Sequence, residues 1–179
     1  MQCEVEGRPG LVLVEAKANV PELSRAGKSR GRSARSPRSA DSVRRGSENH
    51  DRIGIAIADA YTGLSVPIPG IRISRDTHFQ LSNRLAFGWK LASMGIPTVL
   101  VYLGFTGDEG IREVGEPFAD DAHWQREFRA HLTGVCPAIA LDRPLDVSGC
   151  SFWLLSRSKP RLENSPPRPE RKKSPANDG

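Results

Sequence analysis

A glutamate and a lysine stand two residues apart at the end of an apolar run, a spacing that suits chemistry on a phosphate group. The run 11–17 reads LVLVEAK. Side chains alternate across a β-strand, so Glu15 and Lys17 share one face with Leu11 and Leu13, with Cα atoms roughly 7 Å apart. Charged groups are rarely buried without a partner or a metal ion. Two interpretations follow: a metal-dependent phosphodiesterase site, or a strand end whose charges meet water or each other.

A divalent cation at Glu15 would make this pair catalytic. Mg²⁺ or Mn²⁺ prefers oxygen ligands, and Mg²⁺ is usually held by one or two carboxylates together with water and phosphate oxygens. The metal lowers the pKa of a bound water, and Lys17 would orient that water or neutralise the phosphate. Such a site needs a second carboxylate, which Glu4 or Glu6 would supply across a hairpin. We therefore expect Glu15 and Lys17 to be catalytic and Glu15, Glu4 and Glu6 to be metal ligands.

A second group of polar side chains lies on the helix predicted over residues 76–94. Gln80 and Arg84 are four residues apart, so they share one face of that helix. An amide or a guanidinium at this place can hold a phosphate or a ligating carboxylate, because both groups donate hydrogen bonds to anionic oxygens. We expect Gln80 and Arg84 to support the site, the alternative being a helix face that meets only solvent.

The elements that must position these residues follow from apolar periodicity and turn residues. Gly7–Gly10 has turn chemistry, and Asn49 and Gly95 suit a helix start and a helix stop. Leu81, Leu85 and Trp89 form an apolar stripe at helical spacing. The pattern predicts strands at 1–6 and 11–17, helices at 50–63 and 76–94, a strand at 97–105, a helix from Asp120 or Asp121 to Gly134, and weaker strands at 138–141 and 152–155. This order is typical of an α/β domain with a mixed sheet.

The positive charge of the chain is concentrated in two segments. The 179 residues carry a net charge of +5. Residues 24–47 hold eight Arg or Lys and one acid, a net of +7, and residues 156–179 hold seven and three, a net of +4, which leaves −6 for the rest. The predicted organisation is a hairpin with the Glu15–Lys17 strand over 1–23, a disordered Arg/Ser/Gly-rich insert over 24–48, the remainder of one α/β domain over 49–155, and a disordered basic tail over 156–179. The insert can contact phosphates nonspecifically or serve as a plain linker.

The remaining composition favours a cytoplasmic protein that does not enter a membrane. The three cysteines are scattered without a CxxC motif, so a disulfide framework is not expected. No signal peptide precedes the first apolar run, and no apolar run approaches the length needed to span a bilayer.

The stretch Val14-Glu-Ala-Lys17 resembles the ExK half of the motif of the PD-(D/E)xK nuclease superfamily, whose fold is restriction-endonuclease-like. The stretches 50–64, 75–87 and 97–105 are similar to a group of uncharacterised bacterial proteins of that fold. The resemblance covers about residues 11–23 and 49–135. It implies a three-layer sandwich with a central mixed sheet, a magnesium-dependent nuclease activity, and a nucleic acid as partner.

Two departures from the superfamily pattern bear on activity. An acidic residue, usually Asp, precedes ExK on an adjoining strand in that superfamily, often after an N-terminal helix. Here fourteen residues precede Glu15, with no Pro-Asp pair, so we expect an N-terminally truncated version of the fold. In that superfamily a helix usually follows ExK, and here the basic stretch 24–47 takes the place of that helix.

Three hypotheses about function follow. The first is a Mg²⁺-dependent phosphodiesterase acting on nucleic acid. The second is a catalytically inactive binding or structural protein that keeps the nuclease fold. The third is a nuclease-like domain of a toxin or mobile-element system, in which a partner protein matters more than catalysis.

Overall fold

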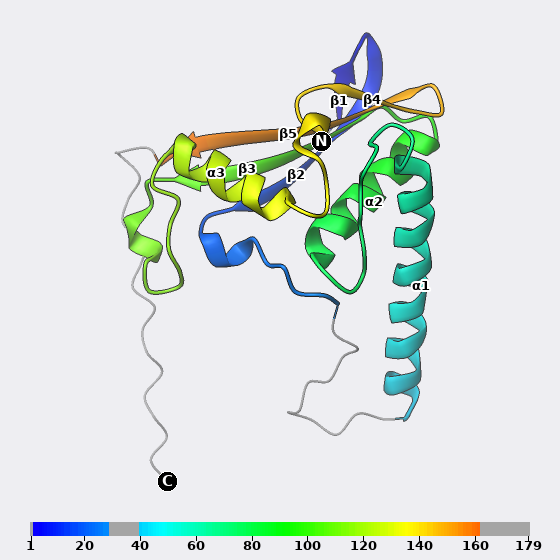
Figure 1. The fold of residues 1–179 in the computed structure, drawn as a ribbon, viewed down its shortest axis with the longest axis horizontal. Helices are drawn as coiled ribbons and strands as arrows, with labels where there is room; N and C mark the ends of the chain where they lie inside the picture. Colours follow the sequence, from blue (N-terminus) through cyan, green and yellow to red (C-terminus); the bar gives the residue numbers. More distant parts are fainter. Residues whose placement is uncertain (1, 29–39, 162–179) are drawn as a thin grey trace.

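A five-stranded mixed sheet with three α-helices forms the body of the protein (Figure 1). The computed structural model describes residues 2–28 and 40–161. Along the described residues the elements are β1 (Gln2–Val5), β2 (Arg8–Lys17), the short 3-10 helix η1 (Val20–Glu22), α1 (Ala40–Leu64), α2 (Phe79–Ser93), β3 (Thr98–Thr106), η2 (Glu109–Ile111), α3 (Asp121–Leu132), η3 (Ala138–Ala140), β4 (Pro144–Val147) and β5 (Cys150–Pro160). The α/β class and the mixed sheet are as the sequence predicts.

The sheet has the strand order β1-β2-β3-β5-β4. Its three inner strands run parallel, and the edge strands β1 and β4 pair antiparallel with β2 and β5. The register sets Glu15 beside Tyr102 and Lys17 beside Gly104. The carboxyl ends of β2 and β3 therefore meet at one edge of the sheet, with Glu15 and Lys17 at that edge.

Helices α2 and α3 pack on the same face of the sheet. A Cβ atom at Gly88 of α2 would lie 2.6 Å from the ring of Phe152, and one at Gly104 of β3 would lie 2.3 Å from Trp124 of α3. Phe152 pairs with Thr98, which lies on the same face of β3 as Gly104, six residues further along. The chain moves from β2 to β3 to β5 in one direction, and right-handed crossovers in one direction place their helices on one face.

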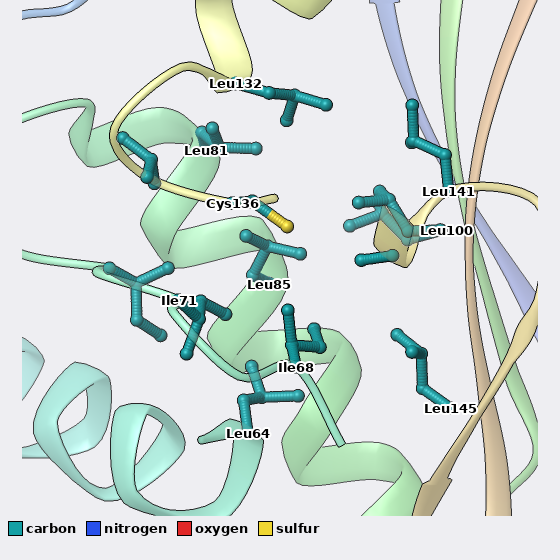
Figure 2. Packing of buried hydrophobic residues seen from close by; sticks show 14 of the residues in the cluster. Leu64, Ile68, Ile71, Leu81, Leu85, Leu100, Leu132, Cys136, Leu141 and Leu145 are labelled. Carbon is teal, nitrogen blue, oxygen red and sulfur yellow. The ribbon is translucent and has the colours of Figure 1, made fainter. Parts of the chain in front are cut away.

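The hydrophobic core lies between this face and the helices (Figure 2). Leu81 and Leu85 of α2 approach Leu100 of β3, and Leu132 at the end of α3 closes the same cluster (Figure 2). All four leucines are almost entirely removed from solvent. Each such side chain contributes about 1.5–3 kcal/mol of transfer free energy, so this cluster fixes α2 and α3 over the sheet.

The opposite face of the sheet carries apolar side chains that remain partly or largely exposed. Val14 is 51% exposed and Phe105 is 39% exposed. Val101, Leu103 and Leu155 point to the same side and are half-buried. None of these belongs to the core cluster, so the described helices leave this face uncovered.

Helix α1 begins at Ala40, ten residues before the predicted start, and Asn49 lies inside it instead of capping it. Its last turns bury Ile57, Ala60 and Leu64. Its first turns extend away from the sheet, past the end of α2 (Figure 1). Adding turns to an existing helix is far less costly than nucleating one. The polar residues before His50 therefore become helical, although their composition predicted disorder.

The boundaries of the other predicted segments also change. Residues 25–28 are held by backbone hydrogen bonds to residues 75–79, including Lys28 N to Arg75 O at 2.8 Å. The predicted insert 24–48 is thus pinned at its start and helical at its end, while its part 29–39 and the tail from 162 onward lie outside the described residues. The first five residues of the predicted tail, 156–160, belong to β5.

Two short elements differ from the expectation near the carboxyl end. The predicted strand at 138–141 is the 3-10 helix η3. The edge strand β4 was not predicted, because Pro144 and Asp146 occur in a strand of only four residues and both residue types are depleted in strands.

Candidate functional site

Lys17 is a buried ammonium with two hydrogen-bond acceptors. It is 7% exposed at the last position of β2. Its Nζ donates to Oε1 of Glu15 at 2.7 Å and to Oε1 of Gln80 at 2.8 Å. A buried cation is costly unless it is paired and hydrogen-bonded, so these two contacts account for its place beneath α2.

Glu15 is bonded by a cation at each of its two oxygens. Lys17 binds Oε1, and Nε of Arg84 donates to Oε2 at 2.6 Å. Burial by itself would raise the pKa of Glu15, but the hydrogen bonds and charges of Lys17 and Arg84 outweigh it and hold the pKa below its usual value. Glu15 is therefore ionised at neutral pH, and each of its oxygens accepts a hydrogen bond from a side chain of this chain.

Helix α2 supplies the other two predicted residues. Gln80 and Arg84 lie one turn apart, which places both over the end of β2. The structure thus brings together Glu15, Lys17, Gln80 and Arg84, the four residues predicted for the centre of the site. Gln80 and the Nε atom of Arg84 bind other side chains, so this part of the helix face does not meet only solvent.

Glu4 and Glu6 lie far from this group, which corrects the predicted second metal ligand. The hairpin register pairs Glu4 with Pro9, six residues along β2 from Glu15, a distance of about 20 Å at strand spacing. Glu6 sits in the turn and accepts a hydrogen bond from Ser151. Neither carboxylate can share a cation with Glu15 in this arrangement.

The donors at the site do not match a Mg²⁺ or Mn²⁺ centre. Mg²⁺ is bound in an octahedral shell, usually through one or two carboxylates. Within residues 2–28 and 40–161, Glu15 is the one carboxylate bonded into this cluster, and no group of three His, Cys, Asp or Glu side chains converges anywhere. A divalent cation at Glu15 would meet the positive charges of Lys17 and Arg84, which repel it. We therefore derive no catalytic step through a metal.

Tyr102 is a site neighbour that the sequence analysis did not single out. It lies beside Glu15 on β3, is 1% exposed, and its hydroxyl has no hydrogen-bond partner among the described residues. Burial, followed by the charge of Glu15, raises the pKa of Tyr102, so it remains a neutral phenol. The sequence feature that could have revealed this residue is a tyrosine within the otherwise apolar run of β3.

Two histidines form a second polar pair close to Lys17. The rings of His78, which precedes α2, and His131, at the end of α3, have centroids 5.3 Å apart. Burial first, and then the charges of His78, Arg25 and Lys17, lower the pKa of His131 to about 4. Both histidines are therefore neutral at physiological pH. His131 is one of the buried residues of α3.

Other polar residues near α2 lie apart from the site. Asp76 precedes the helix and pairs with Arg75. Asn83 lines a hollow of about 240 Å³ between α1 and α2, together with Phe87 and Trp89. Asn83 therefore belongs to the contact between α1 and α2 and not to the site with Gln80 and Arg84.

Comparison of the chain with protein-family models, with curated protein sequences and with solved structures finds no match. No helix in the described part of the chain is long and apolar enough to cross a bilayer. The geometry of Glu15, Lys17, Gln80 and Arg84 is therefore the basis for a proposed function.

Proposed function

We propose that this chain is a nucleic-acid-binding domain with a restriction-endonuclease-like fold, which binds a backbone phosphate at Arg84 and does not cleave it through a metal ion. The observation that carries the proposal is the engagement of both Glu15 oxygens by the chain's own cations. A glutamate paired with two cations in this way is a weaker metal ligand, because both positive charges repel a divalent cation. The site keeps an excess of one positive charge, since Lys17 and Arg84 face a single carboxylate.

The exposure of each side chain decides which one meets the ligand. Arg84 is 46% exposed at its side chain, whereas Lys17 is 8% exposed. Arg84 is therefore the side chain that contacts an anion. Lys17 is buried and neutralises the charge of Glu15. Arginine suits this role because its planar guanidinium binds two oxygens of one phosphate.

Binding of a fluorescently labelled DNA or RNA in EDTA, followed by anisotropy, tests the proposal. Arg84→Gln should weaken binding by about tenfold to a hundredfold, since a charge-assisted contact contributes roughly 1.5–3 kcal/mol. The matched control is Arg126→Gln on α3, an exposed arginine whose Nε is also bonded to a glutamate, Glu127. Equal loss in both variants, or no loss in either, would contradict a phosphate site at Arg84.

A metal-dependent phosphodiesterase is the second candidate, favoured by the ExK spacing on β2 with Gln80 hydrogen-bonded to the lysine. The test is cleavage of single- and double-stranded DNA and RNA with Mg²⁺ or Mn²⁺, comparing the wild type with Lys17→Ala. Cleavage by the wild type that disappears in a folded Lys17→Ala protein would establish this candidate and overturn the binding-only proposal. Equal background in both proteins would exclude it.

A further inference from the structure

The Arg84 guanidinium is held at one end and open at the other. Its Nε donates to Oε2 of Glu15 at 2.6 Å. Within the described ranges its two terminal nitrogens have no hydrogen-bond partner. Because the guanidinium is planar, fixing Nε also fixes the plane of the two terminal nitrogens.

We propose that Glu15 is a positioning residue, which orients Arg84 so that its two terminal nitrogens bind the two non-bridging oxygens of one phosphodiester. This inference rests on the proposed function and assigns Glu15 a role other than metal ligation. The ligand class is an anion with two equivalent oxygens on one phosphorus atom, as in a nucleic-acid backbone.

The hydrogen bonds that hold Glu15 form a series that begins and ends on α2. Gln80 accepts from Lys17, Lys17 donates to Glu15, and Glu15 accepts from Arg84, which lies on the same helix as Gln80. This series links β2 to α2. A site held in its binding geometry loses less conformational entropy when it takes a ligand, so these hydrogen bonds preorganise Arg84 for the phosphate.

This role makes a prediction opposite to simple electrostatics. Removing the negative charge of Glu15 should strengthen anion binding if charge alone matters, because opposite charges attract and like charges repel. If Glu15 orients Arg84, its removal should weaken binding, because the guanidinium loses the contact that fixes its plane.

DNA binding in EDTA separates these outcomes, with wild type, Glu15→Gln, Arg84→Gln, the double variant and Arg84→Lys. We expect Glu15→Gln to weaken binding about tenfold or more, as for loss of a charged hydrogen bond. The double variant should bind no worse than Arg84→Gln alone, because the two residues act through one contact. Arg84→Lys should also lose affinity, since an ammonium cannot bind two oxygens in a fixed plane.

The control is Glu48→Gln on α1, which removes an exposed glutamate that also accepts from an arginine, Arg44, at 3.0 Å. It should leave binding unchanged. Unchanged or tighter binding in Glu15→Gln, with binding lost in Arg84→Gln, would overturn the positioning role and leave the proposed function standing. Wild-type affinity in Arg84→Lys would also overturn the inference, even if Glu15→Gln failed to fold. Unchanged binding in every variant would remove the proposed function itself.

Discussion

At the scale of single residues, the site is defined by how its charges are satisfied. Lys17 reaches low exposure because Glu15 and Gln80 accept from it. The sequence indicated that Glu15 and Lys17 would share a face. It also suggested Glu4 and Glu6 as their neighbours, because the turn was placed at 7–10. The turn residues are Glu6 and Gly7, both with positive φ, and the register that they set moves both glutamates to the far end of β2.

His131 should make stability depend on pH. Its pKa in the folded protein is lowered from 6.5 to about 4, first by burial. The unfolded chain therefore binds a proton at His131 below about pH 6.5, whereas the folded chain binds it only below about pH 4. The free energy of unfolding falls as the pH drops through this window. We expect about 2 kcal/mol lost between pH 7 and pH 5.

Urea unfolding at the two pH values measures this loss, and His131→Phe should reduce it because phenylalanine does not titrate. His78, whose pKa is also lowered by burial and by Arg25, will contribute a remaining part. An identical pH dependence in wild type and His131→Phe would show that another group is responsible.

At the scale of elements, α2 connects the core to the site. One face of α2 buries Leu81 and Leu85, and another carries Gln80 and Arg84 over β2. The apolar stripe predicted this helix, although it begins at Phe79 instead of at Asp76. The chain before it is tied to residues 25–28, a contact between distant segments that local patterns do not reveal.

Gly88 should be a close-contact position on α2. Alanine is favoured over glycine in a helix by about 1 kcal/mol, but a Cβ at Gly88 would lie 2.6 Å from the Phe152 ring. We expect Gly88→Ala to lower the free energy of unfolding by about 1–3 kcal/mol, as for overpacking of a core.

The matched control is Gly46→Ala on α1, where a Cβ would meet nothing within 4 Å. It should leave stability unchanged or raise it by up to about 1 kcal/mol. Thermal unfolding of both variants measures the contrast, and a gain in stability for Gly88→Ala would show that α2 lies further from β5.

At the scale of the whole molecule, the described sheet is covered on one side. Both crossovers move in the same direction across the sheet, so α2 and α3 share a face while α1 packs outside α2. The sequence predicted a strand at 97–105, and a continuous apolar run of this kind is typical of a strand covered on both faces. That run does form β3, but one set of its side chains lies in the core and the other set lies on the uncovered face.

Two valine substitutions, one on each face of the sheet, should differ in their effect on the free energy of unfolding. Val14→Ala changes a side chain that is 51% exposed on the uncovered face, and Val147→Ala changes one that is 3% exposed on the core face. We expect a loss of about 0.5 kcal/mol or less for Val14→Ala, as for surface substitutions, and about 1.5–3 kcal/mol for Val147→Ala, as for a cavity in a core. Chemical denaturation of the two variants gives both values, and comparable losses would mean that the Val14 face is covered in solution.

The sequence by itself determined the local features: the strand bearing Glu15 and Lys17, the helix bearing Gln80 and Arg84, and the α/β order of the elements. These follow from alternation, helical periodicity and turn residues, which act over a few positions. Only the tertiary structure decided that Arg84 reaches Glu15, that Glu4 and Glu6 do not, and that the helices cover one face. Those outcomes depend on strand register and on the direction of the crossovers, which contacts between distant segments fix.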